Sequence, residues 1–143
     1  MRKTSRHKNK YGLKPMPPML VIRGINPQME TKERAAIIAI NAGQGTVDHY
    51  NLLQDVFNLL YVASEATGRE YLRAFIPRYK AALSSMQLRY ENFGKFGMNY
   101  DDRLALTDMI NTSSYFWLKQ PTEFYLVCDA EVRKFYKSVH VEA

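Results

Sequence analysis

The chain has 143 residues, of which 46% are apolar and 13% aromatic, so it carries enough apolar side chains for one folded core and is not disordered as a whole. Its single cysteine, Cys128, excludes an intramolecular disulfide and fits a reducing compartment. The longest apolar runs fall far short of the roughly 20 residues that span a membrane, and no secretory signal is visible, which predicts a cytoplasmic protein without membrane contact.

The net charge of +6 is unevenly distributed along the chain. The first acidic residue is Glu30, whereas six cations precede Pro15: Arg2, Lys3, Arg6, Lys8, Lys10 and Lys14. From Pro15 onward, 14 basic and 14 acidic side chains cancel. We therefore expect a basic, proline-stiffened N-terminal arm at residues 1–18 and a single helical domain at residues 19–143.

The domain opens with a short apolar run at residues 19–22, which fits an extended anchor. The first helix is expected at residues 32–42, with Thr31 as its N-cap. Its predicted buried face consists of Ala35, Ile38 and Ala42, with Ile37 beside them. The glycine pair within residues 43–45 should end this helix.

The next two elements are also predicted to be helical. Thr46 caps a long helix to about Ala66, with Gly68 as its C-cap, and the apolar positions follow helical spacing: Tyr50, Leu53, Val56, Phe57, Leu60 and Ala63. A further helical stretch is expected over residues 69–93, where Pro77 predicts a kink or a break. Its expected buried stripe comprises Leu72, Phe75, Ile76, Tyr79, Ala82, Leu83, Met86 and Phe93.

Asn99 fits the N-cap of another helix, with two acidic residues in the first turn. The side chains expected to point inward are Leu106, Met109, Ile110, Ser113, Phe116 and Trp117. Pro121 should end or bend this helix, and a last segment follows at residues 122–137, in which Asp129 is a candidate start of a separate short helix. The pattern predicts an all-α fold, an irregular bundle of four or five helices, with a β-containing body as the alternative.

The basic arm is the main functional signal, because Lys and Arg bind phosphates and release counterions. We expect three further cations, Arg69, Arg73 and Lys80, to share one face of the helix at residues 69–93. The predicted nucleic-acid-binding residues are Arg2, Lys3, Arg6, Lys8, Lys10, Tyr11, Lys14, Arg69, Arg73 and Lys80, with Tyr11 as a stacking group. The alternative is that the arm and this face are merely solvated.

Aromatic side chains crowd the C-terminal third of the chain: Tyr115, Phe116, Trp117, Phe124, Tyr125, Phe135 and Tyr136. Such rings stack on bases or form protein-binding surfaces, but at helical spacing most should belong to the core. We expect Tyr115 and Tyr125 to be the most exposed of them.

No arrangement typical of an enzyme is visible. The histidines are far apart and have no metal-ligand spacing: His7, His49 and His140. His49 is expected to serve in helix capping rather than as a general base, and Asp101 and Asp102 as helix-start charges rather than paired carboxylates. Cys128 has the pattern of a buried thiol. We therefore expect no catalytic activity, no bound metal and no cofactor.

Three short motifs resemble a group of small, uncharacterised accessory proteins carried by phages and prophages of proteobacteria. They are Lys8–Asn9–Lys10–Tyr11 followed by Lys14–Pro15, then Gly43–Gln44–Gly45–Thr46 leading into His49–Tyr50 and Leu52–Leu53, and finally Val127–Cys128. The chain departs from the group at Asn99–Tyr100–Asp101–Asp102, where relatives tend to have a Thr-Gly-Pro-Glu type of helix start.

The resemblance implies a bacterial host cell as the setting, and small proteins of this setting typically act by binding. Two hypotheses follow. The first is a non-enzymatic protein whose arm docks on nucleic acid or a ribonucleoprotein complex. The alternative is an anti-defence inhibitor, similar to anti-CRISPR proteins, that binds a host defence protein through its folded surface. The sequence does not discriminate DNA from RNA and leaves the oligomeric state open.

Overall fold

The computed structural model describes residues 28–134, so the predicted arm lies outside the described residues. The described chain forms the helices α2 (Gln28–Asn41), α3 (Val47–Thr67), α4 (Glu70–Arg73), α5 (Ile76–Phe93), α6 (Tyr100–Trp117) and α7 (Thr122–Arg133). No strand is present between residues 28 and 134. The all-α prediction is therefore confirmed, and a β-containing body is excluded for this part of the chain.

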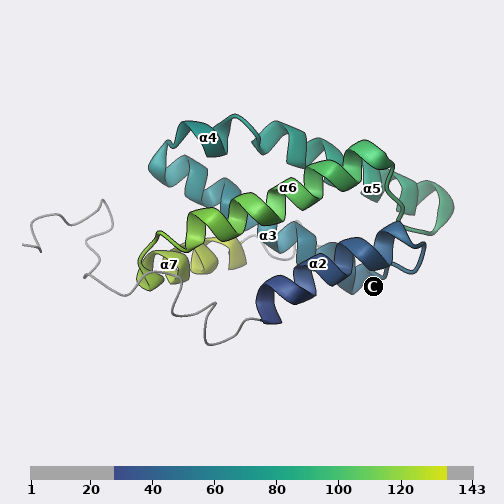
Figure 1. Cartoon of the computed structure of the whole chain (residues 1–143), viewed down its shortest axis with the longest axis horizontal. Helices are drawn as coiled ribbons and strands as arrows, with labels where there is room; N and C mark the ends of the chain where they lie inside the picture. The colour runs from purple at the N-terminus through teal and green to yellow at the C-terminus, as the bar shows by residue number, and fades with distance from the viewer. Residues whose placement is uncertain (1–27, 135–143) are drawn as a thin grey trace, which may run out of the picture.

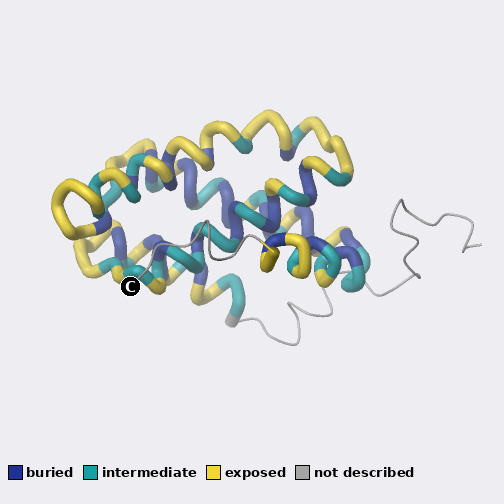
Figure 2. Tube along the Cα trace, turned by 180° about the vertical axis from the view of Figure 1, so that it is seen from behind, coloured by how far each residue is buried: buried dark blue, intermediate teal, exposed yellow. Residues whose placement is uncertain are grey.

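Helix α3 is the centre of the bundle. It packs against α2, α4, α5, α6 and α7, whereas α6 lies between α2 and α5 (Figure 1). The short α4 and the last helix, α7, lie at the same end of the molecule (Figure 1). Buried residues follow the inward sides of the helices, and exposed residues follow their outer sides (Figure 2). The bundle thus has one shared core and an outer face on each of the surrounding helices.

The buried face of α3 is the one that helical spacing predicts. All six expected residues are buried: Tyr50, Leu53, Val56, Phe57, Leu60 and Ala63. The helix is also closed at both ends as expected, because Thr46 forms a capping box with His49, and Gly68 adopts a left-handed conformation with φ 66° as the C-cap. The inward residues expected of α6 are likewise buried.

The connection between α2 and α3 depends on the absence of a side chain at Gly45. A Cβ atom there would lie 2.4 Å from Cγ1 of Ile40, a distance at which something must move. The glycine therefore lets the chain reverse tightly against the end of α2, which places α2 alongside α3.

The prediction for α2 was wrong in both its start and its buried face. The helix begins at Gln28, so Thr31 lies within it rather than at its N-cap. Of the expected face, Ala35, Ile38 and Ala42 are exposed, with Ile38 at 69%, and Ile37 alone is buried; Ala36 and Ile40 complete the buried side. Apolar residues occur around most of this helix, so its rotation is set by packing between α3 and α6 and not by periodicity.

The break expected near Pro77 is confirmed. Helix α4 ends at Arg73, and Pro77 is in the first turn of α5, where a missing N–H leaves no hydrogen bond unmade. The break places Phe75 between two helices, and Phe93 lies at the end of α5, so both rings are exposed rather than buried. Helix α7 runs without interruption through Asp129, so the separate short helix expected there does not form.

Candidate binding surface

A cluster of aromatic and basic side chains lies where α4 meets the C-terminal end of α6. We call it the α4–α6 cluster, and it consists of Arg69, Tyr71, Tyr115 and Lys119. Tyr115 is 54% exposed, and the Lys119 ammonium lies 4.4 Å from the centroid of its ring. Tyr71 meets the same ring edge to face, with the two centroids 5.8 Å apart. The contacts hold the Tyr115 ring in place while its surface stays partly open to solvent.

The charge of Arg69 acts on the hydroxyl of Tyr71. Partial burial raises the pKa of the Tyr71 hydroxyl, the Arg69 charge lowers it, and the neighbouring Tyr115 raises it. The cluster therefore combines two tyrosine rings with the charges of Arg69 and Lys119. An exposed ring beside cations can stack with a nucleobase while the cations contact its phosphates.

Further exposed apolar residues continue along the outer face of α6. At its other end Tyr100 is 64% exposed, and the Arg103 guanidinium lies 5.3 Å from the centroid of its ring. Leu104 is 39% exposed and Leu118 is 38% exposed, at helical spacing from the two tyrosines. This face can contact another macromolecule, because neither α2 nor α5 covers it.

The sequence-predicted site residues within the described chain do not form one helical face. Arg69 precedes α4, Arg73 ends it, and Lys80 lies in α5 beyond the break. All three are exposed, and no acidic residue of the described chain forms an ion pair with them. The seven predicted arm residues lie outside the described residues.

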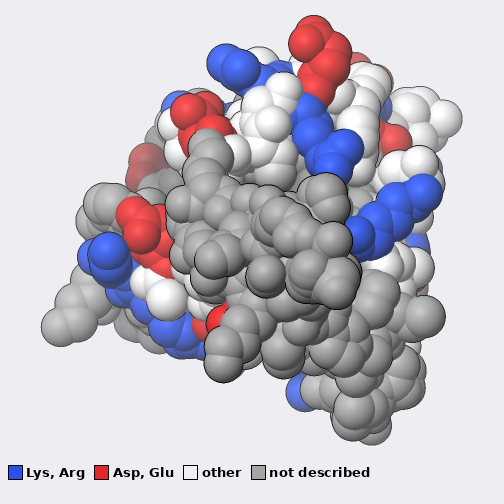
Figure 3. Space-filling model, turned by 90° about the vertical axis from the view of Figure 1, so that its left-hand side faces the viewer, with Lys and Arg blue, Asp and Glu red and all other residues white. Residues whose placement is uncertain are grey.

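Other cations of the body are engaged in structural ion pairs. Within residues 28–134 there are five such pairs: Arg34–Glu30, Arg78–Asp108, Arg89–Asp102, Arg133–Asp129 and Lys134–Glu131. On the face drawn in Figure 3, basic and acidic side chains lie next to one another, with no large area of a single sign among the coloured residues. The described residues carry 12 basic and 13 acidic side chains, so this part of the chain is close to neutral.

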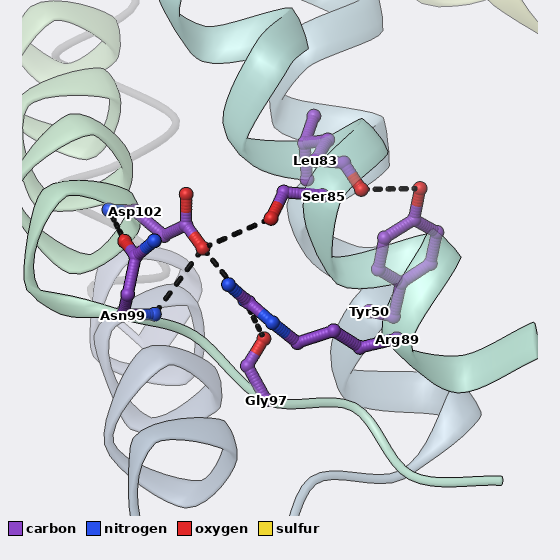
Figure 4. A network of polar contacts seen from close by, with 7 residues as sticks. All are labelled: Tyr50, Leu83, Ser85, Arg89, Gly97, Asn99 and Asp102. Carbon is purple, nitrogen blue, oxygen red and sulfur yellow. Dashed lines mark hydrogen bonds and ion pairs between the residues drawn. The ribbon is translucent and has the colours of Figure 1, made fainter. Parts of the chain in front are cut away.

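Asp102 is at the centre of a polar network that joins α5 to the start of α6 (Figure 4). Its Oδ2 atom accepts hydrogen bonds from the Arg89 guanidinium at 2.7 Å, the Asn99 backbone N–H at 3.2 Å and the Ser85 hydroxyl at 3.3 Å. Arg89 also donates to the Gly97 carbonyl at 3.0 Å. Through Oδ2 the carboxylate thus caps the start of α6 and clamps the preceding loop, which confirms the helix-start interpretation of Asp102.

The remaining candidates for chemistry also have structural roles. Nδ1 of His49 accepts the Thr46 backbone N–H at 3.1 Å, which confirms the capping prediction. Cys128 is fully buried, and burial raises the pKa of its thiol to about 12, with a smaller contribution from Glu131. In the described part of the chain, no group of three or more His, Cys, Asp or Glu side chains could hold a metal ion.

The expected exposure of the tyrosines is confirmed for Tyr115 alone. Tyr125 is partly buried, with its ring edge to face against Trp117 at 5.0 Å. Sequence reasoning also missed Tyr71 and Lys119. The signal for Lys119 was present, because a residue four positions after an exposed tyrosine lies beside it on a helix. Tyr71 could not be found this way, since it belongs to a different helix.

No family model, curated protein or solved structure matches the chain. Among the described helices, none is both long enough and apolar enough to cross a lipid bilayer.

Proposed function

We propose that the chain is a non-enzymatic accessory protein of the phage type, which binds nucleic acid or a nucleic-acid-containing complex through its basic arm. One observation carries the proposal. The described body holds 12 basic and 13 acidic side chains, whereas residues 1–27 hold seven basic side chains and no acidic one. The positive charge of the chain is thus concentrated in residues 1–27, and a basic segment of this kind attracts phosphates.

The α4–α6 cluster supplies a second contact in this proposal. The arm binds phosphates through Arg2, Lys3, Arg6, Lys8, Lys10 and Lys14, with Tyr11 as a stacking group. Tyr115 then stacks with an exposed base, and Lys119 contacts the adjacent backbone. Stacking on a surface ring requires an unpaired base, so the geometry favours single-stranded over duplex nucleic acid.

The test is the salt dependence of binding to fluorescent single-stranded and duplex oligonucleotides, measured by anisotropy. If all six arm cations contact duplex phosphates, log affinity should fall against log salt with a slope of about −5. A full-length variant with the six arm cations replaced by alanine should bind weakly and with a nearly flat slope. The matched control replaces the exposed body cations Arg73 and Lys80 and should keep most of the slope. Undetectable binding of the parent protein at low salt would refute the proposal.

A second candidate function is the anti-defence, anti-CRISPR-like inhibitor, and a specific surface favours it. Ile38 on α2 is 69% exposed and borders a shallow groove of about 400 Å³ between α2 and α6, which Arg34 and Arg103 also line. Exposed aliphatic groups beside arginines are typical of protein contacts. Capture of a defence complex from host lysate that persists after nuclease treatment, and is lost in Ile38→Asp, would support this candidate over the first.

A further inference from the structure

The groove between α2 and α6 lies between two antiparallel helices. The Arg34 guanidinium donates to the Asn111 side chain at 2.7 Å. Three residues further along α6, the Ser114 hydroxyl donates to Glu30 at 2.6 Å. Since increasing numbers on one helix face decreasing numbers on the other, the C-terminal end of α2 lies beside the start of α6, where Arg103 is located.

The lining of this groove is apolar in the middle and basic at its two ends. The residues that line it are Arg34, Ile37, Ile38, Asn41 and Ala42 of α2 with Arg103 and Thr107 of α6. None of these described residues is acidic. Ile38, which is 69% exposed, offers the largest accessible aliphatic surface. The groove therefore suits an occupant that combines an aliphatic side chain with a negative charge.

The two arginines differ in how far their charge is balanced. Arg34 donates from both Nε and Nη2 to one oxygen of Glu30, at 2.9 Å and 2.7 Å, so its charge is compensated within α2. Arg103 instead lies over the Tyr100 ring at 5.3 Å, and none of the five ion pairs within residues 28–134 involves it. A guanidinium over a ring keeps N–H groups in its plane for a carboxylate. The uncompensated positive charge is thus at the Arg103 end.

The spacing along α2 defines the occupant further. Ala42, at the Arg103 end, is four residues from Ile38, which is about 6 Å along a helix. In an extended chain, residues two positions apart are separated by about 7 Å and point to the same face. An aliphatic residue followed two positions later by Asp or Glu therefore matches the groove, and the side chains of Asn41 and Thr107 can hydrogen-bond its backbone.

We propose that the α2–α6 groove binds an extended segment of a partner protein, in which an aliphatic side chain packs on Ile38 and a carboxylate two residues later pairs with Arg103. This contact rests on the second candidate function, in which the folded surface binds a protein, and it specifies the chemistry of that partner. A polynucleotide fits the groove less well, because its phosphates leave the apolar middle unused.

The test titrates short peptides, acetylated and amidated, into isotope-enriched full-length protein. The first peptide carries Leu-Ser-Glu between neutral flanks of glycine and serine. It should shift the backbone amide signals of Ile38, Ala42 and Thr107 to saturation. Two control peptides carry Leu-Ser-Gln, which lacks the charge, and Leu-Glu-Ser, which has the same composition but points the carboxylate to the other face. Both should bind about tenfold more weakly, because each loses one charge-assisted hydrogen bond. Attraction to the basic arm is equal for Leu-Ser-Glu and Leu-Glu-Ser, so it cannot cause their difference.

Substitutions then separate the two halves of the contact. Arg103→Gln should lower the affinity for Leu-Ser-Glu about tenfold and leave that for Leu-Ser-Gln unchanged. The matched Lys95→Gln removes an exposed cation from the loop between α5 and α6 and should bind both peptides as the parent does. Ile38→Ser should weaken both peptides by the same factor. Arg103 and Ile38 are accessible to solvent, so the fold should tolerate these changes, and unchanged amide signals elsewhere would verify this.

Three results would overturn the proposal. The first is the absence of shifts at the groove with Leu-Ser-Glu up to its solubility limit. The second is equal affinity for the three peptides, because the groove would then select no charge. The third is a stronger shift of the groove signals by a single-stranded oligonucleotide than by Leu-Ser-Glu in the variant without arm cations, which would assign the groove to nucleic acid.

Failure of the second candidate function gives a different pattern. If capture of a complex from host lysate is lost in Ile38→Asp but kept in Arg103→Gln, that candidate stands and the partner chemistry proposed here is wrong. If the peptides bind with the expected selectivity but no complex is captured, the candidate is refuted and the preference of the groove is supported.

Discussion

Replacing Asp102 tests how the loop between α5 and α6 is held. Asp102→Ala removes the acceptor of the Asn99 backbone N–H, and loss of such a helix-capping bond costs about 1 kcal/mol. It also leaves Arg89 without its carboxylate. Breaking a fully buried pair costs about 3–5 kcal/mol, but the Arg89 side chain is 32% exposed, so water recovers much of this and roughly 1–2 kcal/mol remains. We expect the free energy of unfolding to fall by roughly 2–3 kcal/mol in total.

Urea unfolding followed by circular dichroism measures this loss, and Asp101→Ala is the matched control. Asp101 is in the same first turn but is exposed, so its replacement removes only a favourable interaction with the helix dipole, about 0.5 kcal/mol. Asp102→Asn keeps a side-chain oxygen and should lie between the two. If Asp102→Ala is no more destabilising than Asp101→Ala, the network in Figure 4 does not hold the loop and the reasoning is wrong.

Three further predictions concern single side chains. Tyr115→Ala should weaken binding of single-stranded oligonucleotides by about 1–3 kcal/mol in the anisotropy assay, whereas Tyr61→Ala, which removes an exposed ring on α3, should leave affinity unchanged. Burial, with a smaller contribution from Glu91, raises the pKa of Tyr50 from 10.0 to about 12, so the unfolded chain loses this proton at a lower pH than the folded chain. The free energy of unfolding should therefore fall as the pH rises from about 10 to about 12. Tyr50→Phe should reduce that loss in alkaline unfolding curves. Alkylation of Cys128 should be slow in the native protein and fast in urea, and equal rates would contradict its burial.

The sequence predicted the fold best where local signals agreed with packing. For α3, the N-cap at Thr46, the C-cap at Gly68 and the apolar spacing all indicate one helix with one buried face. For α2, Ile38 points away from Ile37 and Ile40, so periodicity alone could not select the face that packs against α3 and α6. The same limit applies to the α4–α6 cluster, because Tyr71 and Tyr115 are far apart in the chain and only the tertiary fold brings their rings together.

The distribution of charge determines how the two proposed nucleic-acid contacts depend on each other. A body with 12 basic and 13 acidic side chains exerts little long-range attraction on a polyanion, so the arm must bring nucleic acid to the surface before Tyr115 can stack with a base. Phosphate contacts weaken as the salt concentration rises, because counterion release then contributes less free energy to binding. Stacking of a base on a ring is nearly insensitive to salt. The fraction of the binding free energy that Tyr115 contributes should therefore increase with ionic strength, while total affinity decreases. The binding free energy contributed by Tyr115 could instead decrease with ionic strength as steeply as that of the arm. In that case Tyr115 would assist binding through the charge of Lys119 and not through stacking.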